Sequence, residues 1–231
     1  MKLLPLLALL ALAAPAHAAP LESSVSLSPE VEADPALASF LREEAEAIVA
    51  DYTARAAESA GAAWQLEIRD RATYAGPRFI SVLRQITEET GGAGPLNLVE
   101  GLTWDRTTQD FVRLDAFLAS GGQGRSALGA IARNLRIALV SEVHDGAPGE
   151  TWTGPVVRAT VPDVIVLQNF TLAPSTGPLG VGGVTFHFSA LEVAPNSAGP
   201  ISITIPQMVF RDGVDPALGT LFTGDPQRLN P

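Results

Sequence analysis

The stretch 78-RFISVLRQITEETGGAGPLNLVEGLTW-104 decides the fold. Residues 78–89 are rich in β-branched and aromatic side chains, and apolar side chains recur at 96, 98, 102 and 104, mostly at the period of a strand. Gly91–Pro95, between the two runs, has the composition of a turn. The stretch therefore predicts two long strands that pair as an antiparallel hairpin.

Further strands are expected on both sides of this hairpin. Apolar and polar residues alternate over 64–69, just before it. The last third of the chain contains three more β-like runs, at 164–172, 184–188 and 201–205, separated by connections rich in Gly and Pro.

Two amphipathic helices are expected among the strands. The first begins after Asp34, a candidate N-cap followed by Pro35, and ends near Gly61, which suits a C-terminal cap. The second spans about 126–142. Together these elements predict a single α+β domain, a mainly antiparallel sheet covered by the N-terminal amphipathic helix and by the second helix.

The first eighteen residues have the layout of a secretory signal peptide. Lys2 precedes the apolar stretch 3–14, and Ala16-His17-Ala18 supplies a cleavage site of the small-x-small type. The apolar stretch of ~12 residues is shorter than the ~20 that a bilayer requires, so no membrane anchor is expected. We expect a periplasmic or secreted protein after cleavage near Ala18.

The rest of the chain divides into three parts. Residues 19–33 are expected to form a flexible lead or a first edge strand. Residues 34–212 are expected to form the α+β domain, and residues 213–231 a C-terminal tail.

Composition narrows the classes of partner. The net charge of −10 argues against nucleic acid, because phosphates require a basic face. The absence of Cys excludes disulfides and thiolate chemistry. Removal of Lys2 with the signal peptide leaves 14 Arg against 25 acidic residues, a net charge of −11. A cationic partner is therefore electrostatically favoured.

The candidate metal-ligating residues are not spaced as in a metal site. His144 and His187 lie in separate segments without ligand spacing, so we expect no metal and no cofactor. His187 is interpreted as a half-exposed strand residue, because it alternates with the apolar residues of its strand. Trp152, in a predicted loop, is the aromatic residue best placed to contact a partner, with packing in the core as the alternative.

Two stretches, 74–118 and 184–206, together resemble a known family. They are similar to the extracytoplasmic domain of RsiV-type anti-sigma factors, which also precedes the catalytic domain of PdaC-type peptidoglycan deacetylases. The matching residues are Arg78, Ser81 and Val82, Gly91–Pro95, Leu114, Asp115 and Phe117, then Phe186, Phe188, Glu192, Ala194, Pro195, Ala198, Gly199, Pro200, Thr204, Ile205 and Pro206. Two positions depart from the family pattern: Gly94 stands where the family tends to have His, and Asn196 where it has Tyr.

The resemblance implies a helix over a β-sheet and a role in binding. RsiV-type members bind lysozyme as sensors, so the implied partner is a lysozyme-like cationic protein or a peptidoglycan-associated protein. The implied contact residues are Glu192, Pro195, Asn196 and Gly199. Trp152 is the fifth expected contact residue, because it lies in a predicted loop.

Two other functions remain open from the residues alone. A cell-wall hydrolase could use carboxylates that folding brings together, and Glu192 is the first acid to test for this role. The alternative role of Glu192 is to accept a hydrogen bond from a loop amide or an Arg. The remaining function is that of an exported structural or stress-linked protein without a small ligand.

Overall fold

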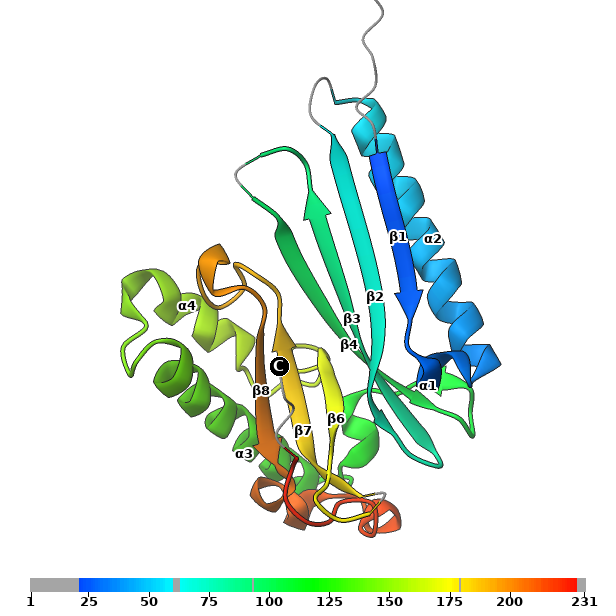
Figure 1. The fold of residues 1–231 in the computed structure, drawn as a ribbon. Helices are drawn as coiled ribbons and strands as arrows, with labels where there is room; N and C mark the ends of the chain where they lie inside the picture. Colours follow the sequence, from blue (N-terminus) through cyan, green and yellow to red (C-terminus); the bar gives the residue numbers. More distant parts are fainter. Residues whose placement is uncertain (1–20, 60–62, 93, 179, 228–231) are drawn as a thin grey trace, which may run out of the picture.

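A computed structural model describes residues 21–59, 63–92, 94–178 and 180–227. The predicted signal peptide and the predicted helix cap at Gly61 lie outside the described residues. Within them, the chain forms the α+β fold expected from the sequence, with two sheets and flanking helices (Figure 1). No described helix is both long enough and apolar enough to cross a membrane.

The first sheet has the strand order β1-β2-β3-β4-β5. Its strands are β1 (Leu21–Leu27), β2 (Trp64–Ala75), β3 (Phe79–Glu89), β4 (Leu96–Asp105) and β5 (Asp110–Phe111). The predicted hairpin is confirmed, since β3 and β4 pair antiparallel from Phe79 opposite Asp105 to Glu88 opposite Leu96.

The segment before the first long helix is part of this sheet. β1 pairs parallel with β2 along its whole length, and the short helix α1 (Pro29–Glu32) follows it. Of the two interpretations of residues 19–33, the edge strand is therefore the one found over 21–27, and the flexible lead is wrong there. The hydrogen bonds to β2 are the physical reason, because they fix the backbone of β1.

Helix α2 (Pro35–Ala57) covers one face of the first sheet. It begins where the sequence predicts, because the Asp34 carboxylate accepts a hydrogen bond from the Leu37 N–H at 3.3 Å. Its buried side chains are Leu37, Ala38, Leu41, Ala45, Tyr52 and Ala56. All of these except Ala56 belong to two apolar clusters with β2 and β3, one around Ile80 and Val82 and the other around Leu66 and Ile68.

The second sheet has the order β6-β7-β8, with β6 (Phe170–Pro174), β7 (Val181–Phe188) and β8 (Ile201–Pro206). Only the end of the predicted strand 164–172 is extended. Residues 164–167 form a turn instead, in which the Asp163 carboxylate accepts a hydrogen bond from the Ile165 N–H at 2.8 Å.

Two helices pack beside the second sheet. Helix α3 (Gly122–Ala138) begins four residues earlier than expected and continues into a π-helical turn, Leu139–Val143. Helix α4 (Gly149–Ala159) replaces the loop predicted around Trp152. Gly154 and Pro155 give this segment a turn-like composition, but burial of Val156 holds it against the core.

The C-terminal segment belongs to the domain. Val214 forms a β-bridge with Leu118, and Phe222, which is 1 % exposed, packs edge-on against Phe117 and Phe210. The boundary expected at residue 212 is therefore wrong, because the aromatic core requires residues beyond it.

The second sheet and α2 lie on opposite faces of the first sheet (Figure 1). Gly101 permits the close approach of β4 and β6, because a Cβ atom there would lie 2.6 Å from the Phe170 carbonyl oxygen. The Ser81 hydroxyl accepts a hydrogen bond from the Leu172 N–H at 2.9 Å. The ends of β1–β4 farthest from this contact extend beyond the second sheet.

The outer edge of β4 is occupied by the second half of the chain. The Asn169 amide accepts from the Gly101 N–H at 2.6 Å and donates to the Val99 carbonyl at 3.1 Å. The Ser189 hydroxyl accepts from the Val99 N–H at 3.0 Å, and the Ala190 N–H donates to the Asn97 carbonyl at 2.9 Å. These contacts satisfy backbone groups that β5 is too short to reach.

A buried ion pair lies between the two clusters under α2. Arg84, 1 % exposed, donates to both oxygens of buried Asp70 at 2.8 and 2.9 Å, and to the Leu41 carbonyl at 2.9 Å. It also donates to the Glu44 carboxylate at 3.1 Å. This guanidinium therefore joins β2, β3 and α2.

We predict that Arg84→Met lowers the free energy of unfolding by about 3–5 kcal/mol, because the substitution leaves the Asp70 carboxylate buried without its cation. Urea unfolding measures the loss. Arg69→Met is the matched control: its ion pair with Glu67 is exposed and is worth less than about 1 kcal/mol. Equal losses in the two variants would show that the buried ion pair contributes no more to stability than the exposed one.

Candidate functional site

A polar groove crosses the part of the first sheet that the second sheet leaves uncovered. Two adjoining hollows of about 360 and 280 Å³ form it, and Glu67 and Thr87 line both. The remaining lining residues are Glu22, Ser23, Ser24, Gln65, Leu66 and Glu89 in the first hollow, and Arg69, Gln85, Ile86, Asn97, Leu98, Val99 and Pro200 in the second. Most of these side chains are polar, as expected for a sheet face that contacts water.

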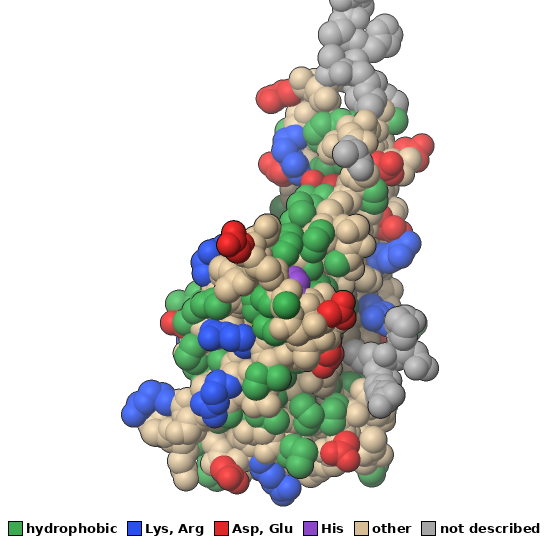
Figure 2. Space-filling model, turned by 90° about the vertical axis from the view of Figure 1, so that its left-hand side faces the viewer, with side chains coloured by type: hydrophobic (Ala, Val, Ile, Leu, Met, Phe, Trp, Pro, Cys, Tyr) green, Lys and Arg blue, Asp and Glu red, His purple; other side chains and the backbone are tan. Residues whose placement is uncertain are grey.

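The end of the groove nearest β1 is acidic. Glu22, Glu67 and Glu89 line it, and Arg69 forms an ion pair with Glu67 at 2.6 Å. In Figure 2 both acidic and basic side chains are visible on the upper part of the molecule, where the ends of the first sheet lie. The carboxylates of Glu22 and Glu89 give this end a negative charge that suits a cationic ligand.

The other end of the groove is bounded by residues 189–200, which connect β7 to β8. We call this segment the 189–200 loop. Pro200 lines the groove, and the Asn196 amide lies 3.4 Å from the Pro95 carbonyl, to which it donates. Pro195 and Asn196 are exposed, so the loop presents both to solvent beside the β3–β4 turn.

Glu192 closes the first turn of the loop. Its carboxylate accepts a hydrogen bond from the Ser189 N–H at 2.9 Å, and the Glu192 N–H donates to the Ser189 carbonyl at 3.1 Å. The carboxylate bond is one half of a capping box, whereas the Ser189 hydroxyl, which would supply the other half, accepts from the Val99 N–H instead. Burial of the carboxyl group raises the pKa of Glu192, while the Ser189 N–H opposes this rise. Of the two roles considered for Glu192, the structure thus shows the hydrogen-bond partner of a loop amide.

Trp152 is connected to the loop through a residue that sequence reasoning did not select. The Trp152 and His144 rings stack with centroids 6.4 Å apart, and His144 Nε2 donates to the Val193 carbonyl at 2.9 Å. The structure therefore places Trp152, on α4, behind the loop and not in a loop of its own. The spacing of His144 in the sequence carries no signal of this contact, which depends on the tertiary fold.

Gly199 ends the loop in a conformation that favours glycine. Its φ is +66°, and a side chain there would be strained even though the space around it is open. Four of the five predicted contact residues, Glu192, Pro195, Asn196 and Gly199, thus share one loop beside the groove, and Trp152 supports that loop.

His187 is buried, which corrects the prediction of a half-exposed side chain. It is 1 % exposed, and its ring nitrogens lie 2.9 Å from Thr171 Oγ1 and 2.8 Å from Ser202 Oγ. The predicted alternation is right, but all eight residues of β7 are buried, so both faces of the strand are covered. Burial, with Arg71 nearby, lowers the pKa of His187 to about 4.

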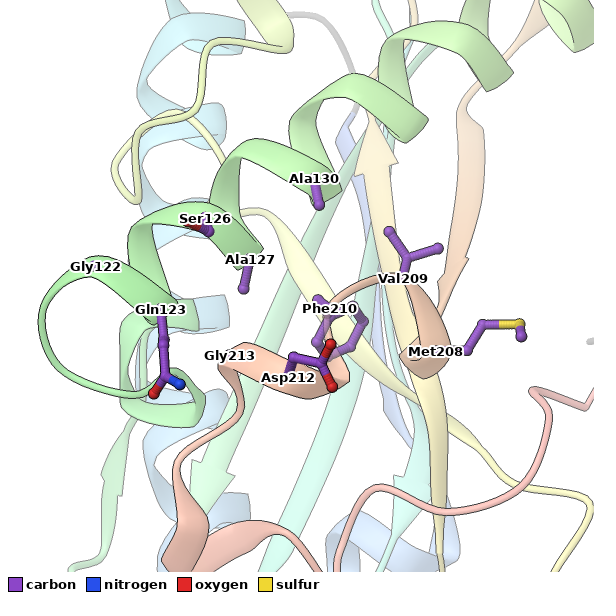
Figure 3. Close-up of a pocket in the computed structure, with 10 residues that line it drawn as sticks. All are labelled: Gly122, Gln123, Ser126, Ala127, Ala130, Met208, Val209, Phe210, Asp212 and Gly213. Atoms are coloured by element: carbon purple, nitrogen blue, oxygen red, sulfur yellow. The ribbon is translucent and has the colours of Figure 1, made fainter.

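A separate hollow lies near the end of β8, between the start of α3 and the turn at 207–213 (Figure 3). Its volume is about 550 Å³, and small residues of α3, among them Ser126, Ala127 and Ala130, form one wall. Met208 and Asp212 lie on the other side. None of the predicted contact residues lines this hollow. No group of three or more His, Cys, Asp or Glu side chains among the described residues is placed to hold a metal ion.

Comparison with solved structures identifies the fold. A DUF3298 family protein from Pseudomonas aeruginosa PAO1 aligns with a TM-score of 0.55 and 19 % identity, over 90 % of this chain and 88 % of that one. A DUF3298 family member from Bacteroides fragilis NCTC 9343 aligns with a TM-score of 0.53 and 19 % identity, over 80 % of this chain and 72 % of that one.

These alignments show that the chain has the fold of DUF3298 family proteins, a domain of unknown function. No family model and no curated protein sequence matches the chain. The RsiV-type resemblance, which rests on the motifs alone, stays a prediction.

We predict a loss of stability between about pH 7 and pH 5 that depends on His187. The folded pKa of about 4 lies below the unfolded value of 6.5, so the unfolded state binds the proton first as the pH falls. The stability that neutral, buried His187 contributes is therefore present above pH 6.5 and is lost as the pH falls toward 4. Between pH 7 and pH 5 the free energy of unfolding of the wild type should fall by about 2 kcal/mol more than that of His187→Gln. Urea unfolding measures both. Parallel losses in both proteins would contradict the prediction.

Proposed function

We propose that the chain is an exported binding module of the bacterial cell envelope and that its partner is a cationic, lysozyme-like protein. The observation that carries the proposal is the 189–200 loop, which is fixed to the rest of the fold on several sides and borders one end of a groove whose other end is acidic. The motif resemblance supports the same surface, since Glu192, Pro195 and Gly199 match the family pattern within this loop.

The loop has the properties of a preorganised contact surface. Ser189 and Ala190 tie its start to β4, the Ser189–Glu192 turn closes on itself, and His144 holds Val193. A segment that is already ordered loses little conformational entropy on binding, so its contacts contribute more fully to affinity. This is the physical reason for assigning the recognition surface to the loop.

Charge supports a cationic partner. The mature chain would carry a net charge of −11, and Glu22 and Glu89 line the groove without forming an ion pair among the described residues. Complementary charge raises the association rate and suppresses wrong partners. A lysozyme-like protein meets this requirement, and binding to the peptidoglycan polymer is the alternative outcome that the experiment distinguishes.

The test uses the chain from Ala19 onward and hen lysozyme, titrated by calorimetry at low and moderate salt. We expect binding that weakens with salt. The double variant Glu22→Gln/Glu89→Gln should bind about threefold to tenfold more weakly, because exposed ion pairs are each worth roughly 0.2–1 kcal/mol.

Glu43→Gln/Glu46→Gln is the matched control, because both residues are exposed on α2, on the opposite side of the sheet. It removes the same charge and should change the dissociation constant less than the groove variant. Equal changes in the dissociation constant would show that the groove contributes only through the net charge of the protein. If the folded wild type binds no lysozyme at either salt but sediments with purified peptidoglycan, the partner is the polymer and not a lysozyme-like protein.

A further inference from the structure

Leu191 is a large apolar side chain of the 189–200 loop that faces solvent. Ala190, Val193 and Ala194 are buried, whereas Leu191 is 56 % exposed. Burial of Val193, two residues on, shows that the same turn can direct a large apolar side chain toward the core.

The backbone of Leu191 is strained. Its φ is +70°, in the left-handed region that glycine and asparagine adopt more readily. The other described non-glycine residues with positive φ are Gln109 and Asp145, which are polar. Strain of this kind persists only where the surrounding structure enforces it, and it is concentrated at functional sites.

The surrounding structure does enforce it. The two hydrogen bonds between Ser189 and Glu192 span Leu191, the Ala190 N–H is bound to Asn97, and the Val193 carbonyl is bound to His144. Residues on both sides of Leu191 are thus held, and the side chain has one direction available, outward. An apolar side chain that projects from a fixed frame loses little conformational entropy when a partner buries it.

We propose that Leu191 is the apolar anchor of this loop and that it inserts into an apolar cleft on the cationic partner. This inference rests on the proposed function and specifies its central contact. The cleft of the partner would bury the leucine side chain, while the acidic end of the groove, near β1, would meet basic side chains elsewhere on the partner. The strained backbone is retained because a relaxed residue would not project the side chain in this direction.

The experiment compares Leu191→Ala and Leu191→Gly in the chain from Ala19 onward, again with hen lysozyme. Both variants remove the anchor, so each should bind about tenfold more weakly than the wild type. Only glycine also relieves the backbone, so the Tm of Leu191→Gly should lie about 2–4 °C above that of Leu191→Ala. At an ordinary position glycine would be the less stable of the two.

Met208→Ala is the control, because Met208 is 72 % exposed and lines the separate hollow beside α3. It should bind lysozyme as the wild type does. Unchanged binding by folded Leu191→Ala, with the wild type binding, overturns the anchor and leaves the proposed function standing. A Tm for Leu191→Gly below that for Leu191→Ala overturns the strain on which the anchor depends. A wild type that binds no lysozyme overturns the proposed function and the anchor together.

Discussion

The outer edge of β4 is the constraint on which both the fold and the candidate site depend. At Trp104 and Asp105 this strand has β5 as a neighbour, but between Asn97 and Gly101 its backbone groups would face solvent. An open edge of this kind is a template for unwanted pairing. The chain resolves the problem with side chains, because Asn169 and Ser189 supply the donors and acceptors that another strand would have supplied. The same contacts fix the start of the 189–200 loop, so the loop inherits its position from a requirement of the sheet.

The opposite face of the same sheet obeys a different constraint. Arg84 lies among apolar side chains, and a buried guanidinium is tolerated only when its donors are satisfied. Asp70, Leu41 and Glu44 satisfy it from β2 and α2. The pair therefore fixes the position of α2 along the sheet, which the apolar contacts alone would leave less specific. With α2 fixed on one face, the uncovered part of the other face is free to form the polar groove.

Local patterns predicted those parts of the fold that depend on local physics. The β3–β4 hairpin follows from alternation and a glycine-rich turn, and the start of α2 follows from Asp34 and Pro35, because a cap and a strand period involve residues close in sequence. Two of the predictions that failed concern burial by distant segments. Both faces of β7 are covered, so His187 is buried, and the aromatic core extends to Phe222, so the last residues are not a tail. No short window of sequence contains this information.

The candidate site divides in the same way. The Ser189-x-x-Glu192 pattern is a local signal, and the bond from the Ser189 N–H to the Glu192 carboxylate could have been predicted from it. The proximity of the loop to Asn97 and His144 could not, because those residues are about fifty to ninety positions away in the chain. What folding adds to the motif is therefore rigidity and a neighbouring charged surface. A turn that is only locally stable would sample many conformations and would have to be ordered on binding. Held by β4 on one side and by His144 on the other, the same turn can keep Leu191 in a conformation that an isolated peptide would leave.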